Sequence, residues 1–533
     1  MEVSTAQLSP GSPSAAYPRW VMLEQDNKSR RQHDSSYFKG DPNTLATGRT
    51  TTGHQIQATF RFADPPASSR VCVQLQAHPS HAVARDIWVI AAHGDSVLIQ
   101  VTVIQDPNGY RPGATIDHFV YSAGDAAAVP PWPPSLSLLP PYYIGKNYSS
   151  RPRSRELSTR ATGLVRRGED EFVVAELTMA TMTKDDTPEL RADELLLFRS
   201  GEWIVIKSPV IRNGDPEFGE LHANSFTNVV VPVGDRLLCW VNQDKGLLLC
   251  DVFEESPILE YVKLPVDPCP KWPPGAYRNV CATTWGAVLK LVNVFPRCCC
   301  GGEGTTDCER SEGACVINTW TLRMDDMEWV KDGMVDATEL WASDTYEGLP
   351  HLTLAHPVVS VDEPHVICFA MIQDDNTPSD DKTVWKLMVD MRSKTIQSFS
   401  CHPGALRDRY HTCKALVPSS VTYFLNSCRA SSSNRTSYSK GAQSKVEIER
   451  SPVQVTDGYA SNCKSSEEPV VQASEILTAL QEIPSYGLDR DDMLKATCRI
   501  LCHGNGRRFK TLLSLPPNLR KDWLLMEIKA CED

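Results

Sequence analysis

The sequence of 533 residues lacks an uninterrupted apolar run long enough to cross a membrane. A spanning helix needs about 18 or more consecutive apolar residues. The longest apolar region, Ile87–Ile104, is broken by the polar residues HGD, which predict a hairpin turn. The N-terminus lacks the basic and apolar regions of a secretory signal, and Glu2, with no arginine before Arg19, argues against a transit peptide. We therefore expect an intracellular protein, cytoplasmic or nuclear, without a transmembrane segment.

Basic residues are outnumbered, because 54 Lys and Arg stand against 66 Asp and Glu, which gives a net charge of −12. An acidic chain binds polyanions poorly, so we do not expect nucleic acid as its main partner. Cysteine is sparse too, with 18 residues, well below the density of a disulfide scaffold. Many cysteines stand singly in apolar runs and predict buried free thiols in a reducing compartment: Cys239, Cys250, Cys281 and Cys368.

Catalytic and nucleotide-binding motifs are also missing. The sequence has no GxGxxG at a strand-to-helix turn, no Walker-type GxxxxGKS or GxxxxGKT, no GxSxG and no HExxH. His118 and His93 could serve as general bases, but neither has a matched nucleophile, so we expect structural roles. Asp251 could bind a ligand, yet we expect its carboxylate to accept hydrogen bonds from turn or strand-edge N–H groups. We expect neither enzymatic activity nor a cofactor.

Two kinds of loop could hold a metal ion. Asp185–Glu189 and Asp374–Asp381 resemble cation-binding loops, but they lack the ligand order and the turn glycine of an EF-hand. The loop FPRCCCGGEGTTDCERSEGAC contains four weak candidates for zinc ligands: Cys298, Cys300, Cys308 and Cys315. Its spacing is not CxxC…CxxC, and adjacent cysteines cannot easily share one metal. We favour solvated loops and an inert insertion, with a metal site or redox chemistry of the cysteines as alternatives.

Helical periodicity is nearly absent between residues 55 and 425, where only Val335–Thr345 predicts a short helix. Short apolar runs separated by turn residues every 8–12 residues predict consecutive antiparallel hairpins instead. More than 20 such strands are too many for one sandwich, whereas a propeller of four to eight four-stranded blades accommodates them. Because no strict repeat is present, we predict a degenerate β-propeller, with two stacked β domains as the alternative. The proline-dense segment Pro130–Tyr143 predicts an extended surface loop.

The most apolar part of this pattern is Phe226–Leu264. It contains the runs VVVPV, LLCWV and LLLCDVF, separated by the turn residues GDR and NQDKG, and then LEYVKLP. Continuous apolar runs of strand length predict strands that are buried on both faces. We therefore expect an antiparallel meander that forms one blade.

The same segment resembles the plant family called domain of unknown function 1618 (DUF1618), which is expanded in grasses. The family pattern is W-V-D-x-x-x-G followed by I or L, then L-x-C-D-V and P-x-L-x-Y, and Asn242 stands where Asp is commoner. The matching residues are Trp240, Val241, Gly246, Leu248, Cys250, Asp251, Val252, Pro257, Leu259, Tyr261, Leu264 and Pro265. The resemblance extends over roughly residues 18–405. Because the family's activity is uncharacterised, the resemblance implies no mechanism.

Composition divides the chain into four predicted regions. Residues 1–17 predict a disordered N-terminus, 18–428 the propeller-like domain, 429–468 a disordered Ser-rich linker and 469–533 a small helical domain. Between residues 488 and 529, 9 Lys and Arg stand against 5 Asp and Glu, a local charge of 9 − 5 = +4. The weak candidates for a nucleic-acid or partner patch are Arg507, Arg508, Lys510, Arg520 and Lys521.

The sequence thus favours a non-enzymatic scaffold that binds protein partners through a β-propeller-like domain. One alternative is an enzyme or small-ligand binder that uses the propeller channel; it requires acidic and histidine side chains with shifted pKa values at one mouth. Another alternative is a nucleic-acid-linked regulator that acts through the basic C-terminal helices.

Overall fold

A computed structural model gives the structure of the chain. It describes residues 16–27, 40–76, 82–105, 113–124, 132–144, 153–168, 171–179, 192–213, 228–267, 274–297, 313–374, 382–402 and 415–426. The chain divides into two compact units, Met1–Ala442 and Gln443–Asp533, and all the described residues lie in the first. The predicted domain boundaries stay a prediction.

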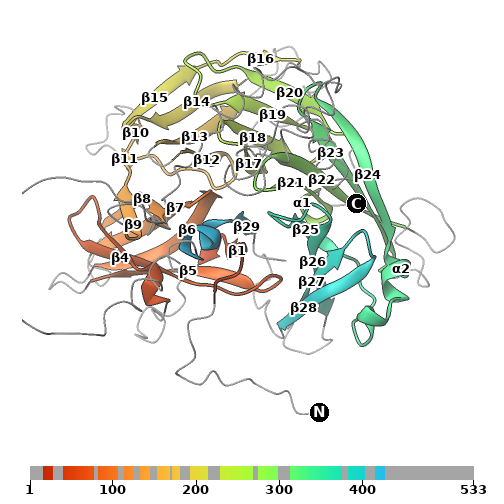
Figure 1. Ribbon diagram of the computed structural model, residues 1–533. Coiled ribbons are helices and arrows are strands. Elements are labelled where there is room, and N and C mark those ends of the chain that lie inside the picture. The colour runs from red at the N-terminus through yellow and green to blue at the C-terminus, as the bar shows by residue number, and fades with distance from the viewer. Residues whose placement is uncertain are drawn as a thin grey trace, which may run out of the picture. The chain divides into compact units, whose positions relative to one another are not determined.

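The described part of the chain forms six sheets of four or five strands around a common centre, a six-bladed β-propeller (Figure 1). This confirms the predicted degenerate propeller and sets its blade number. In hydrogen-bonding order, blade 1 contains β29 (Leu416–Ser419), β1 (Val21–Glu24), β5 (Ser68–Leu75), β4 (Gln55–Arg61) and β3 (Ala46–Arg49). Blade 2 contains β2 (Asp26–Asn27), β6 (Val83–His93), β7 (Ser96–Gln105), β8 (Gly113–Ser122) and β9 (Ser135–Leu138).

The other four blades are meanders of consecutive strands, and blade 4 has one additional outer strand that pairs in parallel with the last strand of its meander. Blade 3 contains β12 (Thr162–Arg167), β13 (Glu171–Met179), β14 (Ala192–Arg199) and β15 (Glu202–Lys207). Blade 4 contains β17 (Val229–Val233), β18 (Leu237–Asn242), β19 (Gly246–Asp251), β20 (Leu259–Lys263) and β16 (Ile211–Arg212). Blade 5 contains β21 (Arg278–Thr283), β22 (Val288–Pro296), β23 (Cys315–Arg323) and β24 (Glu328–Asp336). Blade 6 contains β25 (Ala355–Val359), β26 (Val366–Asp374), β27 (Lys382–Asp390) and β28 (Thr395–His402).

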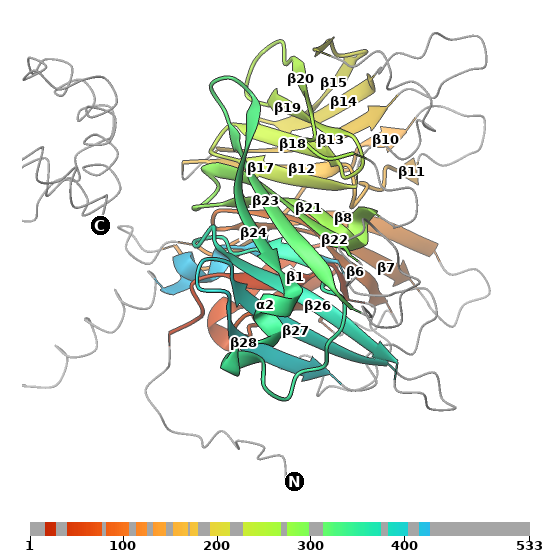
Figure 2. The ribbon, with the colours of Figure 1, turned by 90° about the vertical axis from the view of Figure 1, so that its right-hand side faces the viewer.

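Among the described residues, helical elements are few and short. They are α1 (Pro274–Tyr277), α2 (Ala337–Trp341), the 3-10 turns η2 (Pro42–Thr44) and η6 (Asp344–Tyr346), and a helical turn over residues 421–426. The short helix predicted within Val335–Thr345 is confirmed as α2, which Asp336 caps by accepting a hydrogen bond from the Thr338 N–H at 2.9 Å. It packs beside β23 and β24 (Figure 2). No helix in the described ranges is long and apolar enough to span a membrane.

The ring is closed by strands from opposite ends of the described chain. Strand β29 pairs antiparallel with β1, with Val21 opposite Ser419, and β1 pairs in parallel with β5. Blade 1 therefore contains both the first and the last strand of the propeller. Closing the ring in this way replaces the open edge that a linear array of blades would leave.

The meander predicted from Phe226–Leu264 is confirmed as β17 to β20 of blade 4. Successive side chains of a strand point to opposite faces, so its continuous apolar runs supply two interfaces at once. In β18, Leu238 and Trp240 face blade 3, whereas Cys239 and Val241 face blade 5. Gly163 of β12 permits the close approach of blades 3 and 4, because a Cβ there would lie 2.6 Å from Leu238.

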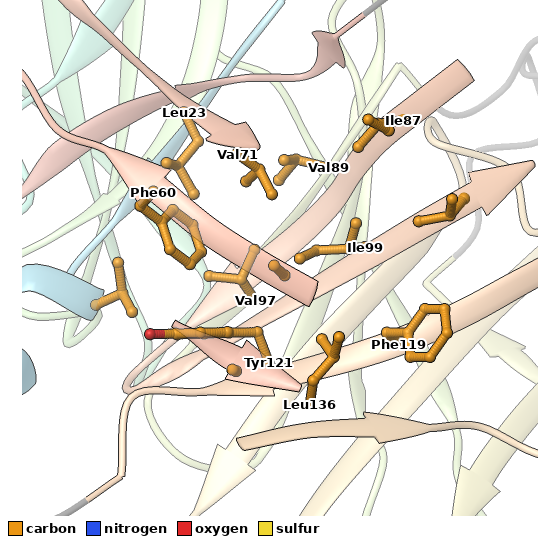
Figure 3. Packing of buried hydrophobic residues seen from close by; sticks show 14 of the residues in the cluster. Leu23, Phe60, Val71, Ile87, Val89, Val97, Ile99, Phe119, Tyr121 and Leu136 are labelled. Atoms are coloured by element: carbon orange, nitrogen blue, oxygen red, sulfur yellow. The ribbon is translucent and has the colours of Figure 1, made fainter. Parts of the chain in front are cut away.

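Each pair of neighbouring blades shares a hydrophobic cluster. Blades 1 and 2 share the one drawn in Figure 3, in which the Phe60 ring lies 4.7 Å from the Tyr121 ring, edge to face. The other five clusters join blades 2 and 3, 3 and 4, 4 and 5, 5 and 6, and finally 6 and 1. The ring is thus held by apolar contacts between faces of adjacent sheets.

One local expectation was wrong in part. The proline-dense segment Pro130–Tyr143 was expected to be a loop, but it contains β9, which pairs with the outer side of β8. An edge position tolerates the flanking prolines, because only one side of the strand needs hydrogen-bond donors. Beyond β9 the segment covers blade 3, where the Trp203 indole donates to the Pro140 carbonyl at 2.6 Å.

Candidate functional site

Hairpin turns from blades 2 to 6 meet on one face of the ring. We call this face the turn mouth; it consists of residues 93–96, 166–168, 234–236, 284–287 and 361–365. The Gly234 N–H donates to the Gly286 carbonyl at 2.9 Å, and the Trp285 N–H donates to the Val361 carbonyl at 2.8 Å. Blades 4, 5 and 6 are therefore tied together at the turn mouth.

His93 links blades 2 and 3 to blade 4 at the turn mouth. Its Nδ1 accepts the Arg166 N–H of blade 3 at 2.9 Å, and its ring also hydrogen-bonds to the backbone of Gly234 in blade 4. Burial, the largest influence, holds the pKa of His93 below its usual value. The neutral imidazole of His93 is therefore hydrogen-bonded on two sides and links blades 2, 3 and 4.

The turn between β21 and β22 has a left-handed backbone. Thr284, Trp285 and Gly286 have φ values of 52°, 57° and 92°. Glycine adopts such values freely, but for other residues this region costs about 1–2 kcal/mol each. Hydrogen bonds from Gly286 to Thr283 at 3.0 Å and from Ala287 to Thr284 at 3.2 Å hold the turn closed. The fold thus maintains a bulky tryptophan in a strained position at the turn mouth.

The side chain of Trp285 is 40% exposed and lies against that of Tyr423, which is 47% exposed. Their ring centroids are 5.0 Å apart. The Arg19 guanidinium lies 5.5 Å from the Trp285 ring centroid and 3.2 Å from the Asp362 carboxylate. We call these four residues, Arg19, Trp285, Asp362 and Tyr423, the mouth cluster. It joins blades 1, 5 and 6.

The mouth cluster exists only when the ring is closed. Arg19 precedes β1, whereas Tyr423 lies in the helical turn that follows β29. The two segments are held together because the Tyr17 N–H donates to Asn426 Oδ1 at 2.7 Å and Asn426 Nδ2 donates to the Tyr17 carbonyl at 2.8 Å. Both ends of the propeller therefore supply side chains to one surface.

Carboxylates flank Trp285 on both sides. Asp235 is exposed and follows Gly234, whose N–H reaches the Trp285 turn from blade 4. On the blade 6 side, Asp362 is held by the Ser360 hydroxyl, which donates to its carboxylate at 2.6 Å. The next residue, Glu363, has a side chain that is 47% exposed. Exposed carboxylates therefore lie on the turns on both sides of the exposed aromatic pair.

His118 lies away from the turn mouth, in the interior of blade 2 facing blade 3. Its Nε2 lies 2.9 Å from Gln100 Oε1, and Gln100 Nε2 donates to the Glu156 carboxylate at 3.1 Å. Burial lowers the pKa of His118 to about 4. The side chain is only 6% exposed, so this predicted base candidate serves as a neutral link between two blades.

Asp251 has the structural role expected for it. Its carboxylate accepts the Phe253 N–H at 3.0 Å and forms an ion pair with Arg236. Of the four cysteines considered as zinc ligands, Cys315 is fully buried at the start of β23, and burial raises the pKa of its thiol to about 11. Cys298, Cys300 and Cys308 lie outside the described residues. Within the described ranges, no group of three metal-binding side chains comes together.

The remaining candidates lie outside the described residues, with one exception. Asp185–Glu189 lies outside the described residues, as does Asp374–Asp381 apart from Asp374, the last residue of β26. The predicted basic patch also lies outside: Arg507, Arg508, Lys510, Arg520 and Lys521.

Sequence reasoning missed the mouth cluster. It gave no role to any of the four residues of the cluster. The available signal was a tryptophan at a turn position, where small or polar residues are usual. The contacts themselves could not be foreseen, because they join three segments that are far apart in the sequence.

Comparisons with known proteins identify no activity. No curated protein matches the chain. A structure described as a GH130 mannoside phosphorylase family member that targets β-1,2 mannosidic linkages in Candida mannan is 9% identical and has a TM-score of 0.22, over 72% of this chain and 96% of that one. A putative glycosidase from Bacteroides thetaiotaomicron is 9% identical with a TM-score of 0.22, over 65% and 93% of the two chains. A glycosyl hydrolase from Bacteroides ovatus is 8% identical with a TM-score of 0.19, over 73% and 96%. With scores this low, these likenesses carry no argument about this chain.

The match to a protein family is more informative. It begins at Trp240, the buried tryptophan of β18, and ends at Cys368 in β26. It therefore covers the end of β18, β19 and β20 of blade 4, all of blade 5 and the start of blade 6. The turn that carries Trp285 lies within it. Residues 240–368 match the family described as Protein of unknown function (DUF1618), which confirms over this segment the resemblance predicted from the sequence.

Proposed function

We propose that the protein is a non-enzymatic interaction scaffold, and that its propeller binds a partner protein at the turn mouth. The observation that carries the proposal is the exposed Trp285 on a left-handed turn, in tilted ring contact with the exposed Tyr423. Backbone strain persists where the surrounding structure enforces it, and it gathers at functional sites. Tryptophan, tyrosine and arginine are also the residues that most often dominate binding energy at protein interfaces.

The histidines of the turn mouth support a binding role over a catalytic one. His93 is engaged by Arg166 and Gly234, so its ring is already used within the fold. The His365 ring lies 3.8 Å from the Glu363 carboxylate and 4.0 Å from that of Asp390, which is longer than a hydrogen bond. A general base needs a hydrogen-bonded orienting partner and a reachable substrate proton. These two side chains are arranged for packing and surface charge.

Site-specific photocrosslinking of the full-length chain in cells tests this proposal. A photoreactive phenylalanine analogue placed at position 285 is expected to give a covalent adduct with a partner protein. The same analogue at position 399 is the matched control, because Phe399 is 55% exposed on β28, the outer strand of blade 6. An adduct that forms at 285 and is lost in Tyr423→Ala supports the scaffold. Absence of an adduct at 285, or equal adducts at both positions, contradicts it.

A further inference from the structure

We infer that the turn mouth binds a basic segment of its partner, in which an Arg or Lys side chain stacks on the Trp285–Tyr423 pair. This inference rests on the proposed function and specifies the chemistry of the partner. Cations are attracted to the faces of tryptophan and tyrosine rings, and Arg uses this contact more often than Lys. Carboxylates beside the rings strengthen the attraction and fix the direction of approach.

The chain already contains one example of this contact. The Arg19 guanidinium lies 5.5 Å from the Trp285 ring centroid while it pairs with Asp362 at 3.2 Å. Arg19 is nevertheless 65% exposed, and the two aromatic side chains keep 40% and 47% of their surface open. Room therefore remains on the ring pair for a second cation, or for a partner's cation in place of Arg19.

The charges of the turn mouth favour such a partner. The charged side chains of the turn mouth, together with Arg19, sum to 4 − 4 = 0: Arg19, Arg166, Arg167 and Arg236 against Asp95, Asp235, Asp362 and Glu363. Two of these arginines pair with carboxylates outside the turn mouth, Arg167 with Glu171 and Arg236 with Asp251 and Glu254. Arg166 pairs with Asp95 at 3.3 Å, and Arg19 pairs with Asp362. Asp235 and Glu363 remain as exposed carboxylates, one on each side of the Trp285 turn.

These charges argue against the opposite kinds of partner. A nucleic acid would bring phosphates against a surface whose arginines already pair with carboxylates, on a chain whose net charge is −12. An acidic peptide would find Arg19 and Arg236, which already pair with carboxylates, and it would also meet Asp235 and Glu363. Like charges brought together oppose binding. A basic segment satisfies both exposed carboxylates and both rings at once.

Fluorescence anisotropy with defined peptides tests the inference on the full-length protein. The probes are three labelled 12-residue peptides of Gly and Ser that contain four Arg, four Glu or no charged residue. We expect the Arg peptide to bind most tightly. Trp285→Ala should weaken it about tenfold or more, and Asp235→Asn with Glu363→Gln should weaken it at least about threefold. Phe399→Ala, the matched control, should leave its affinity unchanged.

Arg19 provides a sharper test, because it occupies part of the same ring face and repels an incoming cation. Arg19→Gln should therefore tighten binding of the Arg peptide, by about threefold. Weaker binding in this variant, or tighter binding of the Glu peptide to the wild-type protein, overturns the inference. Equal binding of the Arg peptide to wild type and Trp285→Ala overturns it as well. If Trp285→Ala does not fold, the variants of the exposed Asp235, Glu363 and Arg19 test the inference in its place.

The two proposals fail in distinguishable ways. A partner adduct at position 285 together with no preference for the Arg peptide would retain the scaffold and reject the basic segment. Absence of both the adduct and peptide binding would reject both. Binding that is lost on adding salt and is indifferent to Trp285 would indicate general attraction to an acidic protein, and it would also count against the inference.

Discussion

Two interfaces of the ring differ greatly in the number of hydrophobic residues that they bury. One lies between blades 1 and 2, and the other between blades 6 and 1. Among the described residues, the first buries a cluster of 21 hydrophobic residues, from Val21 to Leu425, and the second a cluster of 6, around Trp20 and Met22. The first contains the stacked and edge-to-face rings of Phe60, Phe62 and Tyr121. The second is supplemented by the Arg19–Asp362 ion pair at the turn mouth.

The interface with the smaller hydrophobic cluster lies next to the exposed side chains of the mouth cluster. At the interface of blades 1 and 2, strand pattern and burial agree at each step, which is typical of a region that specifies the fold. Next to the interface of blades 6 and 1, the turn between β21 and β22 keeps Thr284 and Trp285 in a left-handed conformation. Two aromatic rings are exposed there. Residues that disfavour a left-handed backbone therefore adopt it at the candidate binding surface. Four measurements can test this contrast between the two interfaces.

The largest effect is expected from the larger cluster. Phe60→Ala removes a fully buried ring that contacts both Phe62 and Tyr121, and it should lower the free energy of unfolding by about 4 kcal/mol. Urea denaturation followed by tryptophan fluorescence measures the loss. Phe399→Ala, which removes a mostly exposed ring, is the control and should change stability little. A small effect of Phe60→Ala would mean that the cluster does not dominate the fold.

We expect a fall in pH to lower the stability of the protein first through the buried His118, before it affects the exposed interface of blades 6 and 1. The pKa of His118 is about 4 in the folded chain, against 6.5 for an unburied histidine, so the unfolded state takes up this proton first. Stability is therefore fully present above about pH 6.5 and falls as the pH drops towards 4, by about 3 kcal/mol in all. Urea midpoints in wild type and His118→Gln, measured across this window, isolate the contribution. The same slope in both proteins would contradict it.

A smaller effect is expected at the closure. Met388→Ala removes a buried side chain from the cluster of blades 6 and 1, and it should cost about 2 kcal/mol. Because Met22 of β1 belongs to this cluster and β1 pairs with β29, the amides of these two strands should gain hydrogen exchange through local opening before those of β18 and β19. Hydrogen-exchange mass spectrometry reads both regions in one experiment. Equal acceleration throughout the propeller would show that the closure is no weaker than the other interfaces.

The smallest effect concerns the strained turn, and its sign is opposite. Thr284→Asn places a residue that tolerates left-handed backbone at a φ of 52°, so stability should rise by about 0.5–1 kcal/mol. Trp285 stays in place, so peptide binding should be kept. Thr47→Asn in the edge strand β3 is the matched control and should be neutral or destabilising, since Asn is disfavoured in strands. A loss of stability in Thr284→Asn would show that the turn is not strained.

Much of the fold could be predicted because its signals are local. The residues HGD between two β-branched runs gave the hairpin of β6 and β7, and the apolar runs around Trp240 gave strands buried on both faces. The edge strand β9 was missed, because its prolines are compatible with a strand only when one side has no partner. The candidate site was missed entirely, since its side chains carry no motif.

The sequence by itself determined the strand-by-strand pattern, the propeller class and the resemblance over blades 4 to 6, because alternation, turn residues and family signatures are read within a few dozen residues. Only the tertiary structure decided the number of blades, the closure by β1 and β29, and the mouth cluster. These depend on contacts such as that between Tyr17 and Asn426, which are 409 residues apart. No local pattern encodes such a contact, because it forms only when the blades have already packed into a ring.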